Sequence, residues 1–105
     1  MDDTTFQALW ATAHGFDNRE AYITENEEAL AKVIRGKEKR EEQLGKMWDV
    51  AHMTIRELIE KAGYNQSSFA RHFCVPLRTV QDWCRKPEAC TPWVKLGFAR
   101  QLGML

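Results

Sequence analysis

The sequence predicts an all-α fold, a compact helical bundle of six or seven short helices. Apolar residues recur at helical spacing, as in Phe6, Leu9, Trp10 and Ala13, which share one face of a helix. Residues 54–57 have the form of a capping box, the pattern that opens a helix. No stretch of six residues alternates between apolar and polar, and no Asn-Gly or Asp-Gly pair marks a hairpin. Strands are therefore not expected.

The first part of the chain predicts two or three short helices. One covers residues 5–14, with Gly15 as its stop. Asp17 followed by Glu20 predicts a capping box for the next helix. Asn26, followed by two glutamates, predicts the N-cap of a third, unless both stretches form one bent helix. The apolar face of this third helix would consist of Leu30, Val33 and Ile34.

Residues 36–43 are almost wholly charged, and they predict a solvated helix start or a linker. A charged interaction arm is the alternative. A further apolar stripe follows at helical spacing and consists of Leu44, Met47, Trp48 and Ala51.

The second part of the chain predicts helices with clear ends. A helix beginning at Ile55 should end at Gly63, which suits a left-handed cap. Thr91 and Pro92 predict an N-cap and a first helical residue. The last helix has apolar residues on more than one face, so it should pack on the N-terminal half or form a dimer contact. These residues are Trp93, Val94, Leu96, Phe98 and Leu102.

Charge divides the chain into an acidic N-terminal helical extension, residues 1–52, and a basic domain, residues 53–105. The first part has 7 Lys and Arg against 11 Asp and Glu, a net charge of −4, and the second has 8 against 4, a net charge of +4. A basic domain suits a polyanionic partner. The sequence contains no apolar run of 18 residues, which a membrane span would need. Its acidic start lacks the features of a signal peptide, so we expect no membrane partner and a cytoplasmic location.

Residues 65–86 predict two short helices joined by a tight turn. Asn65 suits an N-cap, and Tyr64 and Phe69 occupy the positions of a hydrophobic staple. Pro76 ends the first helix because it lacks an N–H and biases Val75 away from helical angles. The second helix would hide one side and expose the other. The hidden side consists of Val80, Trp83 and Cys84, and the exposed side of Arg78, Gln81, Asp82, Arg85 and Lys86.

This stretch resembles the helix-turn-helix of phage-repressor and Cro-like DNA-binding domains. The matching residues are Gln66, Phe69, Ala70, Phe73, Val75 and residues 78–83, with Cys74 at the turn position that usually holds Gly. The resemblance covers about residues 53–105. It implies a lambda-repressor-like fold, with the helix over residues 77–86 lying in the major groove of double-stranded DNA.

The predicted DNA-binding residues fall into two groups. At the start of the first helix, side chains and free N–H groups would hold a phosphate, a role that the resemblance also gives to the first of them; these are Gln66, Ser67 and Ser68. The second group lies on the reading helix and consists of Leu77, Arg78, Thr79, Gln81, Asp82, Arg85 and Lys86.

The residues of the reading helix have different chemistry to offer. Arg78 can donate to guanine O6 and N7, Gln81 can pair with adenine, and Leu77 can contact a thymine methyl group. Arg85 and its neighbour Lys86 would bind phosphate. Asp82 has two interpretations: it orients the neighbouring arginines, or it accepts from cytosine.

Catalysis and cofactors have little support in the sequence. The three His are scattered, and no nucleotide-binding or hydrolase motif occurs, so we expect no enzyme and no cofactor. A zinc site built from Cys74, Cys84 or Cys90 with His72 is not favoured, because no pair has zinc-type spacing. Small buried hydrophobes are the simpler interpretation of the cysteines.

Three functions remain in competition. The first is a sequence-specific DNA-binding protein, a small bacterial, phage or mobile-element regulator that binds inverted half-sites as a homodimer. The second is an antitoxin that represses its own operon and binds a basic toxin through the acidic half. The third is a protein-interaction module that has kept the fold and lost DNA binding; the neutral total charge and Asp82 favour it slightly.

Overall fold

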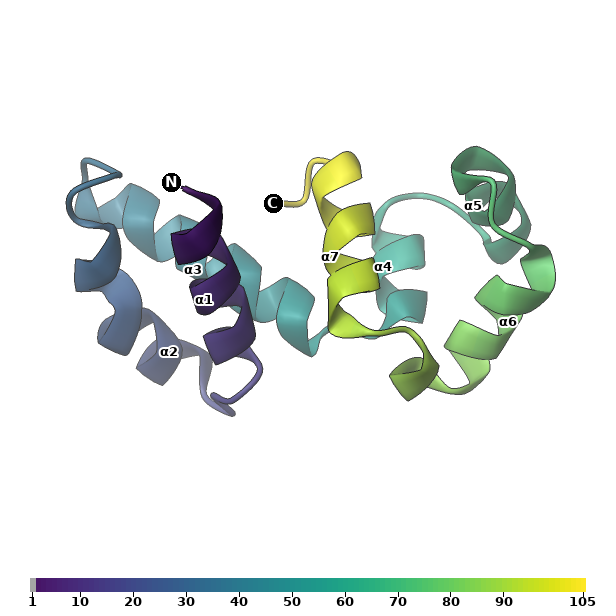
Figure 1. The fold of residues 1–105 in the computed structure, drawn as a ribbon, viewed down its shortest axis with the longest axis horizontal. Coiled ribbons are helices and arrows are strands. Elements are labelled where there is room, and N and C mark those ends of the chain that lie inside the picture. Colours follow the sequence, from purple (N-terminus) through teal and green to yellow (C-terminus); the bar gives the residue numbers. More distant parts are fainter. Residues whose placement is uncertain (1) are drawn as a thin grey trace. The chain divides into compact units, whose positions relative to one another are not determined.

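The computed structural model describes residues 2–105, and these form helices and connecting turns without any strand (Figure 1). The all-α prediction is confirmed. In chain order the elements are α1 (Asp3–Ala13), α2 (Arg19–Asn26), the 3-10 helix η1 (Glu27–Leu30), α3 (Lys37–His52), α4 (Ile55–Lys61), α5 (Gln66–Phe73), α6 (Leu77–Arg85), the 3-10 helix η2 (Pro87–Ala89) and α7 (Pro92–Gln101). Among the described residues, no helix is long and apolar enough to cross a membrane.

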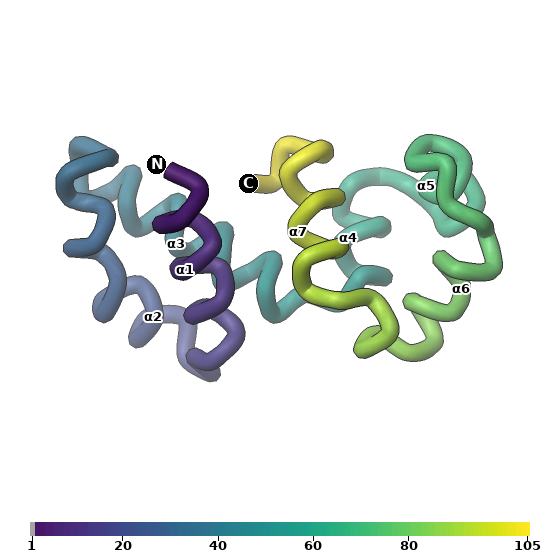
Figure 2. Tube along the Cα trace, in the orientation of Figure 1, coloured from purple at the N-terminus to yellow at the C-terminus, as the bar shows by residue number. Residues whose placement is uncertain are grey.

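The helices group into two compact units that divide between His52 and Met53. The first unit contains α1, α2, η1 and α3, and Leu105 is grouped with it. The second unit contains α4 to α7 with η2. Figure 2 follows the first unit from purple to teal and the second from teal to yellow.

The first unit packs α1 and α2 against α3. Tyr22 of α2 is fully buried, and its hydroxyl donates to the Leu9 carbonyl of α1 at 2.7 Å and faces the Met47 sulfur of α3 at 3.7 Å. This one side chain therefore joins all three helices. Burial raises the pKa of the Tyr22 phenol because the ionised form would lose its hydration.

Two helix starts in this unit differ from the sequence predictions. Helix α1 begins at Asp3, two residues earlier than predicted, because Asp2 caps it and accepts from the Thr5 N–H at 2.7 Å. The predicted cap at Asp17 is wrong. Asn18 caps α2 instead and accepts from the Ala21 N–H at 2.9 Å. Both errors arise because neighbouring Asp, Asn and Thr residues can all serve as caps.

The predicted third helix is a single 3-10 turn. Asn26 ends α2 and does not cap η1, because its side-chain amide donates back to the Tyr22 carbonyl at 2.8 Å. Leu30 is buried as expected, but Val33 is 48% exposed, so the predicted apolar face is wrong there. The alternative of one bent stretch describes this region better, since η1 begins at the residue directly after α2 with no turn between them.

The charged segment is the start of α3, as predicted, and it is solvated except at Arg40, whose ion pair with Glu27 is only 17% exposed. Helix α3 begins at Lys37, and its exposed charges pair one turn apart: Lys37 with Glu41 at 3.9 Å, and Lys46 with Glu42 at 3.4 Å. Such exposed pairs are typical of a helix surface in water.

The helix ends predicted in the second unit are confirmed. Thr54 and Glu57 form the capping box of α4, and Gly63 follows with a φ of +86°, a value that glycine adopts without strain. Thr91 caps α7 and accepts from the Val94 N–H at 3.4 Å. Each helix of this unit thus begins or ends at a residue whose local chemistry requires it.

Candidate nucleic-acid interface

The start of α5 is fixed by two reciprocal hydrogen bonds. The Asn65 side-chain oxygen accepts from the Ser68 N–H at 2.8 Å, and the Ser68 hydroxyl accepts from the Asn65 N–H at 3.0 Å. The predicted N-cap at Asn65 is therefore confirmed. Tyr64 packs edge-on against Phe69 with ring centroids 6.1 Å apart, as a hydrophobic staple requires. These contacts set the direction in which the chain enters α5.

The turn between α5 and α6 is three residues long and is built around a left-handed residue. Cys74 has φ 55° and ψ 39°, and it is the one non-glycine residue with positive φ among residues 2–105. The Val75 N–H then donates to the Ala70 carbonyl at 2.9 Å, and Pro76 leads into α6. The turn geometry usual for glycine is thus achieved with cysteine, at the cost of some strain.

Helix α6 lies on an aromatic core through its apolar side. Val80 and Phe69 are fully buried. The Phe98 ring of α7 lies 5.0 Å from the Phe69 ring and 5.7 Å from the Trp83 ring, measured between centroids. Phe73 completes this cluster at 4.7 Å from Phe69. The cluster joins α5, α6 and α7, so the orientation of α6 is set by packed rings, of which Phe69 is fully buried and the other three are half-buried.

The opposite side of α6 is the candidate interface. Three of its predicted DNA-binding residues are exposed polar side chains, namely Arg78, Gln81 and Arg85. The helix ends one residue earlier than predicted, so Lys86, which is also exposed, follows α6 with a non-helical φ of −128° and ψ of 88°. Leu77 is 40% exposed at the start of the helix, and Thr79 is half-buried beside it. The chemistry of this side is therefore three cations, an amide and one apolar contact.

Asp82 lies half-buried at the edge of this side, and its carboxylate is ion-paired with the Arg85 guanidinium. Of the two interpretations of Asp82 from the sequence, the structure contains the pairing with an arginine. Both side chains remain largely accessible, at 44% for Asp82 and 71% for Arg85. The pair orients the arginine and still leaves guanidinium N–H groups for another acceptor.

The predicted phosphate-binding residues at the start of α5 are placed differently from one another. Ser67 is exposed. Ser68 is half-buried, and its hydroxyl also donates to the Asn65 carbonyl at 3.2 Å, so its side chain serves the cap. Gln66 is half-buried and lines a hollow.

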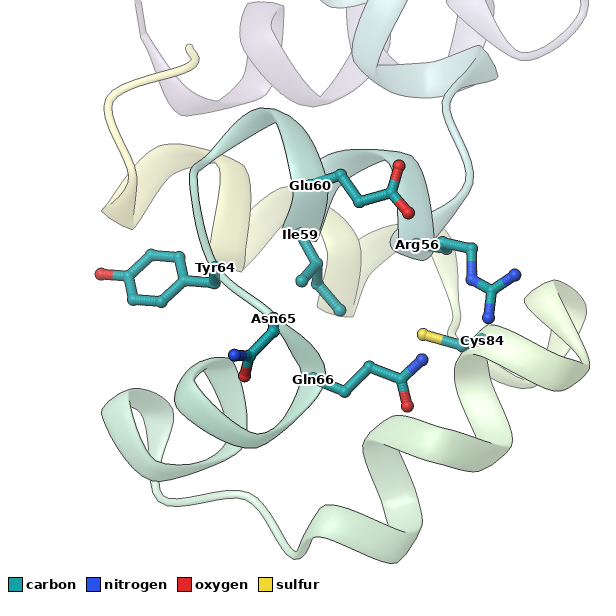
Figure 3. A pocket seen from close by; sticks show the side chains of 7 residues that line it. All are labelled: Arg56, Ile59, Glu60, Tyr64, Asn65, Gln66 and Cys84. Carbon is teal, nitrogen blue, oxygen red and sulfur yellow. The ribbon is translucent and has the colours of Figure 1, made fainter.

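This hollow lies between α4, α5 and α6 and has a volume of about 220 Å³ (Figure 3). It brings Gln66 together with Cys84 of α6 and with Arg56 of α4, which the sequence did not single out. Burial raises the pKa of the Cys84 thiol, and the charge of the nearby Arg56 opposes this rise. The remaining lining residues are Ile59, Glu60, Tyr64 and Asn65.

The cysteines do not form a common site. Cys74 is exposed in the turn, Cys84 lines the hollow, and Cys90 is buried next to η2; all three are free thiols. Burial raises the pKa of Cys90 to about 11, so this thiol stays protonated and unreactive near neutral pH. Within residues 2–105, no three His, Cys, Asp or Glu side chains are grouped as metal ligands would be.

Comparison with protein-family models, with curated proteins and with solved structures finds no significant match to this chain. Its function must therefore be argued from the geometry of α5, α6 and the hollow beside them.

Proposed function

We propose that this chain is a sequence-specific DNA-binding protein that inserts α6 into the major groove. The observation that carries the proposal is the two-sided character of α6. One side, centred on Val80, is buried in the aromatic core. The other exposes Arg78, Gln81 and Arg85, with Lys86 directly after the helix. A helix so anchored, with hydrogen-bonding and cationic side chains on its free side, is suited to reading base edges in the groove.

Each side chain of α6 has a role that fits its position. Arg78, at the start of the helix, donates to guanine O6 and N7, and Gln81 pairs with adenine on the next turn. Arg85, oriented by its ion pair with Asp82, and Lys86 contact the phosphates. Leu77 meets a thymine methyl group.

A single reading helix covers only a few base pairs, so the active form is a homodimer on inverted half-sites about one helical turn apart. Helix α7 supports a dimer contact because Trp93 is 53% exposed and Val94 is 42% exposed. The protein would then act as a small transcriptional regulator.

Selection of bound sequences from a pool of random duplex DNA tests the proposal. We expect a palindromic consensus and an affinity that falls steeply with salt, because phosphate contacts release counterions. Failure to retain any duplex at low salt would refute DNA binding and leave the protein-interaction module.

An antitoxin is the second candidate, and one feature of the first unit favours it. Four glutamates and one arginine, Arg19, line a shallow hollow between α2 and the start of α3. Three of the glutamates have an exposed cation nearby, but the hollow keeps an excess of negative charge that would attract a basic protein. The four glutamates are Glu20, Glu38, Glu41 and Glu42. A toxin gene beside this one, and autorepression relieved by its product, would distinguish the antitoxin from a simple regulator.

A further inference from the structure

Arg56 lies where the dipole of its own helix does not favour its charge. It is the second residue of α4, directly after Ile55, in the first turn, where the helix dipole disfavours a cation. The helix start is already stabilised by the capping box of Thr54 and Glu57. Arg56 is exposed and forms no ion pair within residues 2–105. The helix dipole and the cap therefore give no reason for an arginine at this position. Its guanidinium interacts instead with the Cys84 thiol of α6, and Glu60 lies one turn away on the same helix.

The side chain of Arg56 instead forms one wall of the hollow beside α6. Figure 3 shows the guanidinium of Arg56 and the amide of Gln66, from two different helices, with their polar ends on either side of Cys84. Cys84 follows Gln81 by three residues on α6, so the two are neighbours on the helix surface. The hollow thus lies along the Gln81 edge of the proposed reading side.

The size and charge of the hollow limit what can enter it. Its volume of about 220 Å³ is below the range usual for pockets that bind cofactors or drug-sized ligands. A phosphate group is smaller, and the guanidinium of an arginine can donate two parallel hydrogen bonds to it. Glu60 also lines the hollow and would repel an anion, so a phosphate would favour the end formed by Arg56, Gln66 and Cys84.

We propose that Arg56 and Gln66 together bind one phosphate of the DNA backbone at this end of the hollow. The inference rests on the proposed function, since it places a backbone strand alongside the edge of α6 that reads bases. The guanidinium supplies the charge and two donors, and the Gln66 amide supplies a third. Because a phosphate contact carries no sequence information, its role is to fix the depth and rotation of α6 in the groove.

The test compares Arg56→Gln with Lys61→Gln, which removes the same charge from the last turn of the same helix, outside the hollow. We expect Arg56→Gln to reduce the slope of log affinity against log salt by about 0.9 and to leave the consensus sequence unchanged. Its urea midpoint should stay close to that of the wild type, because the variant relieves the helix dipole and also loses the interaction with Cys84. Lys61→Gln should leave the salt slope unchanged.

Neutral methylphosphonates, placed one at a time in the selected duplex, locate the contact. We expect one position where the substitution weakens the wild type about tenfold and weakens Arg56→Gln much less, because only the Gln66 contact then remains. Equal salt slopes for wild type and Arg56→Gln, or equal losses in both at every methylphosphonate, would overturn the phosphate site while DNA binding stands. If the wild type shows no salt-dependent binding to duplex DNA, the proposed function fails and the phosphate site fails with it.

Discussion

The two units of the chain use their charged residues differently. In the first unit, long-range ion pairs join the elements: the Arg19 Nε donates to Asp49 at 2.9 Å, and the Arg40 Nε donates to Glu27 at 2.6 Å. The Arg40–Glu27 pair is only 17% exposed on each side. In the second unit, cations such as Arg78 are exposed and have no carboxylate partner within residues 2–105.

This difference indicates where a partner is needed. Arg19 and Arg40 already have carboxylate partners on other elements of the first unit, so these two pairs contribute to holding α3 against α2 and η1. Exposed cations gathered on one side of a helix repel one another and gain most from an external polyanion. The comparison therefore predicts a structural role for Arg19 and Arg40 and a binding role for exposed, unpaired cations such as Arg78.

The largest expected effect is a loss of stability when the aromatic cluster that supports α6 is disrupted. Phe69→Ala should lower the free energy of unfolding by about 3–5 kcal/mol, because a fully buried ring that contacts Phe73 and Phe98 is replaced by a cavity. Urea denaturation followed by circular dichroism measures it. Phe69→Leu is the control and should cost less, since it retains most of the buried volume. A loss below about 1 kcal/mol for the alanine variant would contradict the assigned core.

The next effect concerns the reading side itself. Arg78→Ala should cost roughly 1–3 kcal/mol of specific binding and relax the base preference at one position. Lys86→Ala should weaken binding to all sequences alike and reduce the salt slope by about 0.9. Binding titrations on the selected site and on random duplex separate the two effects.

Lys39→Ala is the matched control in the first unit, since Lys39 is also an exposed cation without an ion pair within residues 2–105. It should leave DNA affinity almost unchanged. An equal loss for Lys39→Ala and Arg78→Ala would break the comparison between the units and point to a general charge effect.

A smaller effect is expected at the turn before α6. Cys74→Gly should raise the free energy of unfolding by up to about 1 kcal/mol, because the left-handed conformation strains a residue with a Cβ. Cys74→Val should lower it, since a β-branched residue tolerates this conformation poorly. Thermal unfolding of the two variants beside the wild type measures the difference. A Gly variant that is less stable than the wild type would mean that the thiol itself contributes to the fold.

The sequence predicted those features that depend on neighbours in the chain. The caps at Thr54, Asn65 and Thr91 were predictable because a side chain and an N–H three residues away suffice to form them. The same local rule failed at Asp17 because Asn18, the adjacent residue, could satisfy it too. The predicted N-cap at Asn26 is wrong because its side-chain amide donates to the Tyr22 carbonyl of α2.

The site was predictable only in part, for a related reason. The exposed side of α6 follows from helical periodicity, so Arg78 and Gln81 could be placed from the sequence. Arg56 could not, because its proximity to Gln66 and Cys84 arises when three helices pack together. The available signal was a cation in the first turn of a helix, which helix stability does not explain.

The smallest expected effect lies in the first unit, at Gly45 in the middle of α3. A Cβ at this position would clash with the Arg19 guanidinium, the group that pairs with Asp49. Gly45→Ala should gain up to about 1 kcal/mol of helix propensity and lose an ion pair worth about 0.2–1 kcal/mol. The net change in the free energy of unfolding should therefore be near zero.

In an Arg19→Ala background the pair is already absent, and Gly45→Ala should then stabilise the protein by nearly the full gain in helix propensity. Urea denaturation of all four proteins in this cycle gives the coupling between the two sites. A coupling near zero would show that Arg19 moves aside without loss, and the paired charges of the first unit would then matter less to its fold than their geometry implies.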